Sequence, residues 1–164
     1  MSFLKAPARF VAKQLLLPLI WLFSLPLQAG PVMTMEIKGE FSQNYLKIYE
    51  ALEQHRFFVV FEPNIGQSVS RFKDRWKEDY NRNQLEEIQS LVFCNPWYVN
   101  QVSNKDPQML ALCPLSVTLT QKSGITQIYF LRPSQINPQS PAQPILEELE
   151  ADIVKALKTA VTTD

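Results

Sequence analysis

Two cysteines, Cys94 and Cys113, carry the most specific chemistry that the sequence offers. In an oxidising compartment such a pair predicts a disulfide, and closing a loop of about 19 residues would stabilise the fold by on the order of 3 kcal/mol. Thiolates are also soft metal ligands, so Cys94 and Cys113 form a candidate copper(I) site with the thioether of Met109. A redox-cycling thiol pair is a third interpretation, which the absence of a Cys-x-x-Cys motif disfavours.

The sequence contains no other set of residues with recognisable catalytic or metal-binding spacing. His55 is the only histidine, which leaves a zinc site short of ligands, and nothing orients a Cys-His nucleophilic pair. We expect this histidine to interact with the end of its own helix. The four glycines form no phosphate-binding loop, and neither zinc-protease helices nor serine elbows occur. We therefore predict no catalytic residues, and the sequence identifies no cofactor.

A second candidate site follows directly after Cys94, where amide and aromatic side chains are concentrated. These side chains could line a pocket for a small molecule or a protein partner. The alternative is that the aromatic rings fill the core and the amides hold turns. The candidate ligand-binding residues are Asn95, Trp97, Tyr98, Asn100, Gln101 and Asn104.

The elements that position both candidate sites lie between residues 90 and 133. An apolar run over 90–94 predicts a strand that ends at Asn95, which can cap a helix with Pro96 in its first position. That helix of two or three turns ends before Asp106-Pro107, because proline disfavours helical geometry in the preceding residue. Alternating residues over 115–121 and 125–131, joined by a turn containing Gly124, predict an antiparallel hairpin.

This order of residues resembles the bacterial family of domain of unknown function 302. The residues that carry the resemblance are Cys94-Asn95-Pro96, Asp106-Pro107, the run from Cys113 to Val117, and Arg132-Pro133. It covers roughly residues 34 to 135, and its specific part lies within 94 to 133. It implies a single α+β domain like the core of the TATA-binding-protein fold, a curved antiparallel sheet backed by helices. The resemblance implies no activity, and it allows a homodimer.

The first 29 residues have the order of a secretory signal peptide. Lys5, Arg9 and Lys13 make the start basic, residues 15–27 are almost wholly apolar, and the small residue Ala29 marks the expected cleavage point. The apolar run of about 13 residues is short of the roughly 20 that span a bilayer as a helix. We therefore expect a periplasmic or secreted protein, with an uncleaved membrane anchor as the alternative.

The net charge of the chain argues against a nucleic-acid partner. From residue 30 onward, 13 basic side chains oppose 16 acidic ones, a net charge of −3. A nucleic-acid surface needs clustered lysine and arginine, so we predict no nucleic-acid binding. Seven charged residues of both signs lie between 71 and 79, beside a helical pattern of Val69, Phe72 and Trp76. We interpret them as a solvated helix face.

The remaining elements follow from periodicity and turn residues. We expect a strand over 32–37, a helix capped by Ser42, and a buried strand over 57–61. Residues 137–144 look like a connector, in which Ser140 and Gln143 resemble a capping box at the start of a long helix that packs on the sheet. The predicted organisation is a signal peptide over 1–29, the α+β domain over 30–136, and a connector with a C-terminal helix over 137–164.

The sequence thus favours a non-enzymatic exported module that binds a small molecule or a protein through the end of the domain between Cys94 and Pro114. The alternative is a thiol-dependent redox or soft-metal-handling protein that uses Cys94 and Cys113.

Overall fold

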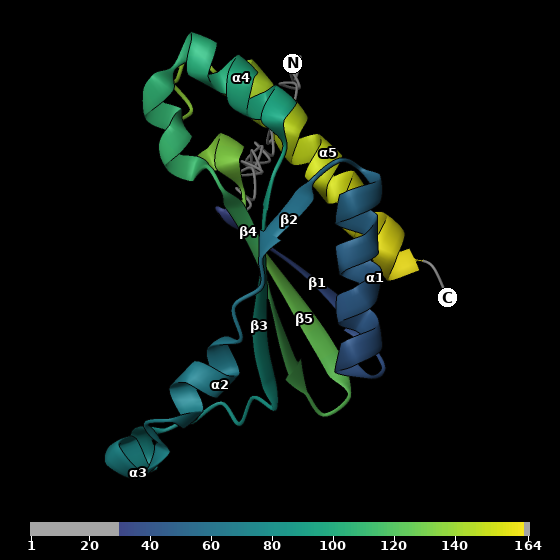
Figure 1. Ribbon diagram of the computed structural model, residues 1–164, viewed down its shortest axis with the longest axis vertical. Helices are drawn as coiled ribbons and strands as arrows, with labels where there is room; N and C mark the ends of the chain where they lie inside the picture. Colours follow the sequence, from purple (N-terminus) through teal and green to yellow (C-terminus); the bar gives the residue numbers. More distant parts are fainter. Residues whose placement is uncertain (1–29, 163–164) are drawn as a thin grey trace, which may run out of the picture.

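The structure of the protein is a computed structural model that describes residues 30–162, so the predicted signal peptide lies outside the described residues. At its centre is an antiparallel sheet of five strands in the order β1-β5-β4-β3-β2 (Figure 1). The strands are β1 (Val32–Lys38), β2 (Phe58–Phe61), β3 (Glu87–Cys94), β4 (Leu115–Lys122) and β5 (Ile125–Leu131).

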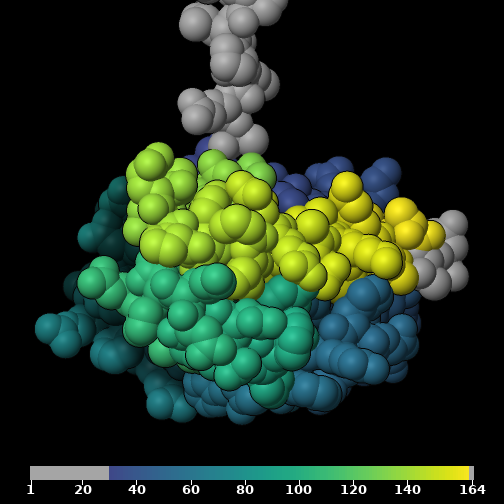
Figure 2. All heavy atoms as spheres, turned by 90° about the horizontal axis from the view of Figure 1, so that it is seen from above, coloured from purple at the N-terminus to yellow at the C-terminus, as the bar shows by residue number. Residues whose placement is uncertain are grey.

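Two long helices, α1 (Phe41–Gln54) and α5 (Gln143–Thr162), cover one face of the sheet side by side. Figure 2 shows α5 in yellow, with the teal segment that contains α4 and the blue α1 next to each other along one side of it. This arrangement confirms the predicted α+β fold class. Of the helices within residues 30–162, none has the length and apolar character that crossing a membrane requires. The shorter elements are α2 (Ile65–Ser70), α3 (Lys73–Trp76), α4 (Pro96–Lys105) and the 3-10 turns η1 (Lys77–Asp79), η2 (Pro107–Leu112) and η3 (Pro133–Gln135).

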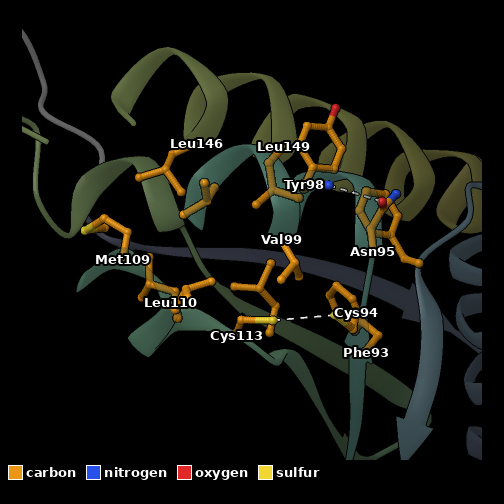
Figure 3. A pocket seen from close by; sticks show the side chains of 14 residues that line it. Phe93, Cys94, Asn95, Tyr98, Val99, Met109, Leu110, Cys113, Leu146 and Leu149 are labelled. Carbon is orange, nitrogen blue, oxygen red and sulfur yellow. Dashed lines mark hydrogen bonds between the residues drawn. The ribbon is translucent and has the colours of Figure 1, made fainter. Parts of the chain in front are cut away.

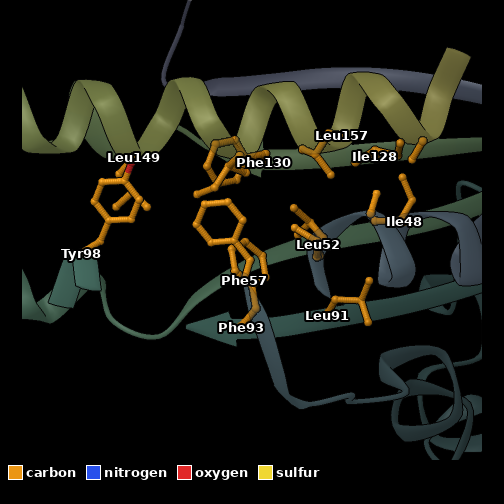
Figure 4. Close-up of a cluster of buried hydrophobic side chains, with 14 of the residues drawn as sticks. Ile48, Leu52, Phe57, Leu91, Phe93, Tyr98, Ile128, Phe130, Leu149 and Leu157 are labelled. Atoms are coloured by element: carbon orange, nitrogen blue, oxygen red, sulfur yellow. The ribbon is translucent and has the colours of Figure 1, made fainter. Parts of the chain in front are cut away.

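The core lies between the sheet and the two long helices (Figure 4). Along β4, Val117 and Leu119 are fully buried, and Ile128 and Phe130 of β5 are buried beside them. Residues on one face of a strand recur at every second position, which is the alternation that the sequence shows. The predicted hairpin is confirmed, and its turn consists of Ser123 and Gly124, both with positive φ, 51° and 74°.

Helix α1 ends at a residue that sequence patterns did not mark. Arg56 takes the left-handed conformation (φ 64°) that glycine usually fills in a Schellman motif. The amide of Phe57 donates to the carbonyl of Leu52 at 2.9 Å, and the amide of Arg56 donates to Glu53 at 2.9 Å. The predicted cap at Ser42 was wrong: Glu40 is the N-cap residue, without a side-chain bond, and Ser42 lies inside the helix.

Strand β2 was predicted to be buried, and this was wrong. It forms the edge of the sheet, so Phe58, Val60 and Phe61 are 47%, 62% and 63% exposed. Phe57, directly before the strand, is buried instead. An apolar run of this length cannot distinguish a central strand from an edge strand, because the distinction depends on which neighbours the fold supplies.

The predicted helix through Val69, Phe72 and Trp76 is two short helices, α2 and α3. Asn64 caps α2, since its Oδ1 accepts from the amide of Gln67 at 2.7 Å. The rings of Phe72 and Trp76 stack on each other at the surface rather than joining the core.

Helix α5 packs on the sheet as predicted and carries a buried carboxylate. Glu150 is 7% exposed, and it accepts hydrogen bonds from Arg132 Nε at 2.7 Å and from the amide of Ser134 at 3.2 Å. The hydroxyl of Ser134 also donates to it. Every oxygen of this buried acid therefore has a partner, and together these bonds fix η3 against α5.

Candidate functional site

The candidate site lies where β3 ends and β4 begins, beneath the segment formed by α4 and η2 (Figure 3). Cys94 is the last residue of β3, and Asn95 then starts α4 as predicted. The Oδ1 of Asn95 accepts from the amides of Trp97 at 3.0 Å and Tyr98 at 3.4 Å, with Pro96 at the first helical position. This cap turns the chain sharply away from the sheet directly after the first cysteine.

The chain returns to the sheet through η2. Asp106 caps this turn by accepting from the amide of Gln108 at 3.2 Å, and its other oxygen accepts from the hydroxyl of Ser140 at 2.6 Å. The amide of Cys113 donates to the carbonyl of Leu110 at 2.9 Å, and a cis peptide bond joins Cys113 to Pro114. Because β3 and β4 are antiparallel neighbours, the return brings Cys113 beside Cys94.

The two sulfurs lie 3.5 Å apart, and both side chains are half-buried. They are free thiols, so the contact between the cysteines is present while the predicted disulfide stays a prediction. Burial raises the pKa of the Cys113 thiol to about 11, and the hydrogen bond and charge of Cys94 add to the rise. The surroundings therefore favour the neutral thiol over the thiolate.

A small apolar hollow opens beside the thiol pair. Its volume is about 30 Å³, and its walls come from β3, α4, η2, β4 and α5. Apart from Asn95, Tyr98 and the two cysteines, the residues that line it are apolar. Leu112 and Leu115 lie on the Cys113 side, and Leu146 and Leu149 of α5 form another wall. A space of this size holds a water molecule or a single ion rather than a drug-sized molecule.

The structure brings only some of the predicted ligand-binding residues together. Asn95 and Tyr98 line the hollow, whereas Trp97 is 63% exposed and does not. Asn100, Gln101 and Asn104 lie on α4 outside the lining. Their role in binding stays a prediction.

Tyr98 ties α4 to the rest of the molecule. Its ring stacks on Phe57 with centroids 6.4 Å apart, and its hydroxyl donates to Asp152 of α5 at 2.6 Å. Burial first, and then the hydrogen bond to Asp152, raise the pKa of Tyr98, so the phenol remains protonated at neutral pH. The ring and hydroxyl thus hold one wall of the hollow against α5.

The other candidate ligands lie apart from the thiols. Met109 lines the same hollow, but Figure 3 shows it on the far side of Cys113 from Cys94. His55 is at the end of α1, where its Nδ1 lies 2.8 Å from the carbonyl oxygen of Ala51, in agreement with the predicted helix-end role. Within residues 30–162, no cluster of three or more His, Cys, Asp or Glu side chains occurs, so the only candidate ligands close to each other are the two thiols.

Sequence reasoning missed the walls that come from distant parts of the chain. Phe57, Leu146 and Leu149 line the hollow, although they lie some tens of residues from both cysteines. The apolar periodicity of the C-terminal helix predicts Leu149 as a core residue but does not include Leu146, and nothing local indicated that either leucine borders the thiols.

Comparisons with known proteins agree with this fold. A crystal structure of an uncharacterized conserved protein DUF302 from Bacillus stearothermophilus is 20% identical to this chain, covering 81% of this chain and 97% of that one with a TM-score of 0.62. At that identity the likeness shows the fold alone. No curated protein matches the chain. The family model of "Domain of unknown function DUF302" matches residues 33–160, and the chain therefore belongs to the DUF302 family.

Proposed function

We propose that the protein is a non-enzymatic binding module whose site is the Cys94–Cys113 pair, and that it binds a soft monovalent metal ion, copper(I), between the two sulfurs. The observation that carries the proposal is the 3.5 Å separation of two thiols in the wall of an apolar hollow. Soft thiolate ligands select copper(I), which they hold more readily than hard cations. A metal–sulfur bond is about 2.3 Å long for zinc, so two sulfurs that hold one ion in a linear arrangement would have to move apart by roughly 1 Å, whereas a bent arrangement would need little movement.

The hollow supports this choice of ligand over a larger one. Its volume of about 30 Å³ suits an ion and excludes a drug-sized molecule. Its apolar walls offer no oxygen ligands beyond Asn95 and Tyr98, and the oxygens that hard ions prefer are therefore scarce.

Titration of the chain from Gly30, which contains every described element, tests the proposal. The reduced protein competes for copper(I) with a chromophoric chelator, and we expect one ion per chain. Cys94→Ser and Cys113→Ser should each abolish binding, whereas Met109→Leu should retain it because Met109 lies away from the pair. Binding that survives either cysteine substitution, or no competition by protein with two free thiols, would overturn the proposal.

A second function is favoured by the same separation. The pair could act as a dithiol–disulfide couple that exchanges with a low-molecular-weight disulfide. The two protein thiols then give up two electrons and two protons and form one S–S bond, and the small disulfide accepts them and is reduced to two thiols. The raised pKa of Cys113 predicts slow exchange near neutral pH, because the thiolate is the attacking species. Equilibration in glutathione buffers of graded ratio distinguishes this function, since a reversible couple shows a midpoint inside the accessible range.

We also infer that the protein is exported, which rests on the basic, apolar and small-residue order of residues 1–29. The mass of the protein from the compartment outside the cytoplasm should correspond to a chain that begins at Gly30. A protein that retains its first residues in a membrane fraction would support the anchored alternative instead.

A further inference from the structure

A short segment at one end of the molecule has no role in the core or in the thiol site. Residues 71–77 belong to the lobe of α2, α3 and η1 that joins β2 to β3. Figure 1 shows α3 at the opposite end of the long axis from α4. All seven of these residues are exposed. We call them the α3 knob.

The α3 knob presents an aromatic pair to solvent. The rings of Phe72 and Trp76 stack with centroids 5.0 Å apart and an interplanar angle of 16°, and they remain 43% and 40% exposed. The amide of Trp76 donates to the carbonyl of Phe72 at 2.9 Å, so one helical turn holds the two rings together. Two large aromatic residues fixed side by side on a surface are typical of an interaction site.

Basic side chains surround the rings. The seven residues contain four cations against Asp74, a net charge of +3 on a chain that carries −3 from residue 30 onward. Glu78 and Asp79 follow directly, and Asp79 pairs with Arg82, so residues 71–82 together carry a net charge of +2. Successive side chains of a helix are about 100° apart, which places Lys73 and Arg75 on the two sides of the ring pair and Asp74 opposite it. None of the cations forms an ion pair with an acidic side chain in the described part of the chain. The four cations are Arg71, Lys73, Arg75 and Lys77.

We propose that the α3 knob docks on an anionic phospholipid surface. Tryptophan and phenylalanine place apolar area at the level of the lipid headgroups, and each lysine or arginine near such a surface gains from its negative potential. The knob projects at the end of the molecule, so a flat surface can reach it. The remainder of the molecule is net acidic and is repelled by anionic lipid, and the long axis holds it away.

An acidic protein surface is the competing partner. It would account for the cations, but it would not require two exposed rings between them. The combination of rings and cations on a projecting turn therefore favours the bilayer.

Vesicle binding by the chain from Gly30 with Trp97→Phe tests the proposal, because Trp76 is then the only tryptophan. We expect cosedimentation and a blue shift of Trp76 fluorescence with vesicles of phosphatidylcholine and phosphatidylglycerol at low salt. Both signals should be absent with neutral phosphatidylcholine vesicles, and both should be lost at high salt.

Charge-matched variants identify the surface that binds. Lys73→Glu with Arg75→Glu should weaken binding by about thirtyfold or more, since each cation lost near the surface costs about fivefold. The same double reversal at Lys155 and Lys158, which are exposed on α5, should bind as the parent does. Circular dichroism checks that each variant is folded.

Three results would overturn the proposal. They are equal binding to neutral and anionic vesicles, an equal loss of binding in both double variants, and absence of vesicle binding at low salt. If the last result were accompanied by binding to polyglutamate that the α3 knob variant loses, the partner would be an acidic protein.

Discussion

The thiols of Cys94 and Cys113 touch each other, and burial raises the pKa of Cys113, which favours its neutral form. No cation and no histidine is among the residues that line the hollow around them. A bound soft metal ion has to displace their protons, so its affinity should rise with pH. The raised pKa of Cys113 makes rapid nucleophilic attack by this thiol unfavourable near neutral pH.

The reactivity of Cys113 gives a first prediction. With its pKa near 11, the rate of alkylation by iodoacetamide should keep rising with pH beyond the value of about 8.5 typical of free cysteine. At pH 8 the thiolate population, and hence the rate, should be on the order of a hundredfold below that of glutathione. Peptide mapping after timed alkylation measures the rate at each cysteine.

A variant separates the causes of this shift. Burial is the larger cause and Cys94 the smaller, so Cys94→Ala should speed the alkylation of Cys113 without lowering its pKa to the free value. A Cys113 that titrates near 8.5 in either protein would contradict this description of the site.

The helix cap at Asn95 links the first cysteine to α4 and gives a second prediction. Asn95→Ala removes the acceptor for two helix amides and should lower the free energy of unfolding by about 1 kcal/mol. Urea denaturation measures the change. Asn95→Ser should recover most of the loss, and Asn104→Ala, at an exposed position on the same helix, should stay within about 0.5 kcal/mol of the parent. Equal losses in the two alanine variants would show that the cap is not responsible.

The buried acid of α5 gives a third prediction. Glu150→Ala removes the partner of Arg132 and the single acceptor of the Ser134 amide and hydroxyl, and should cost about 3 kcal/mol in the free energy of unfolding. Replacing Glu150 and Arg132 together by leucine should cost less than Glu150→Ala, because no charge is then left unpaired. Thermal or urea unfolding measures the stability of both variants. A double variant that is less stable than Glu150→Ala would show that an unpaired charge is not the main cost.

Helices and strands could be predicted from the sequence where neighbouring residues determine them, and not where contacts with distant parts of the chain do. The cap at Asn95, the proline after it and the turn at Gly124 act between adjacent residues, so the elements from β3 to β5 were predicted correctly. Phe72 and Trp76 are four residues apart whether they face a core or stack on each other in water, and local spacing cannot separate these outcomes. Likewise, the exposure of β2 is decided by the absence of a strand beyond it in the sheet.

The candidate site was likewise predictable in part. Neighbouring antiparallel strands bring Cys94 and Cys113 together, which the predicted topology already implied. The small volume of the hollow could not be predicted, because Phe57, Leu146 and Leu149 reach it from elements distant in the sequence. The two cysteines of the candidate site could therefore be predicted from the sequence, whereas the volume of the hollow beside them could not.

For the whole molecule, β2 is one of the two edge strands of the sheet, and its exposed apolar side chains make it a place where two molecules could associate. Its outward amide at Val59 is covered, since Glu53 Oε1 accepts from it at 2.7 Å. Glu53→Ala should uncover this amide beside the exposed Phe58 and Phe61, and so promote association between sheet edges. Light scattering at increasing protein concentration measures the effect. Glu50→Ala removes the same charge from an exposed position of α1 and should leave the oligomeric state unchanged; association of both variants to the same extent would point to charge alone.

Native mass spectrometry of the chain from Gly30 tests the central claim most directly. The protein is reduced, exposed to copper(I) and freed of excess metal, and its mass is compared with that of Cys94→Ser and Cys113→Ser. We expect one copper ion per chain in the parent protein and in Met109→Leu, and none in either cysteine variant. A parent protein with two free thiols and no copper, or copper retained in either cysteine variant, would contradict it.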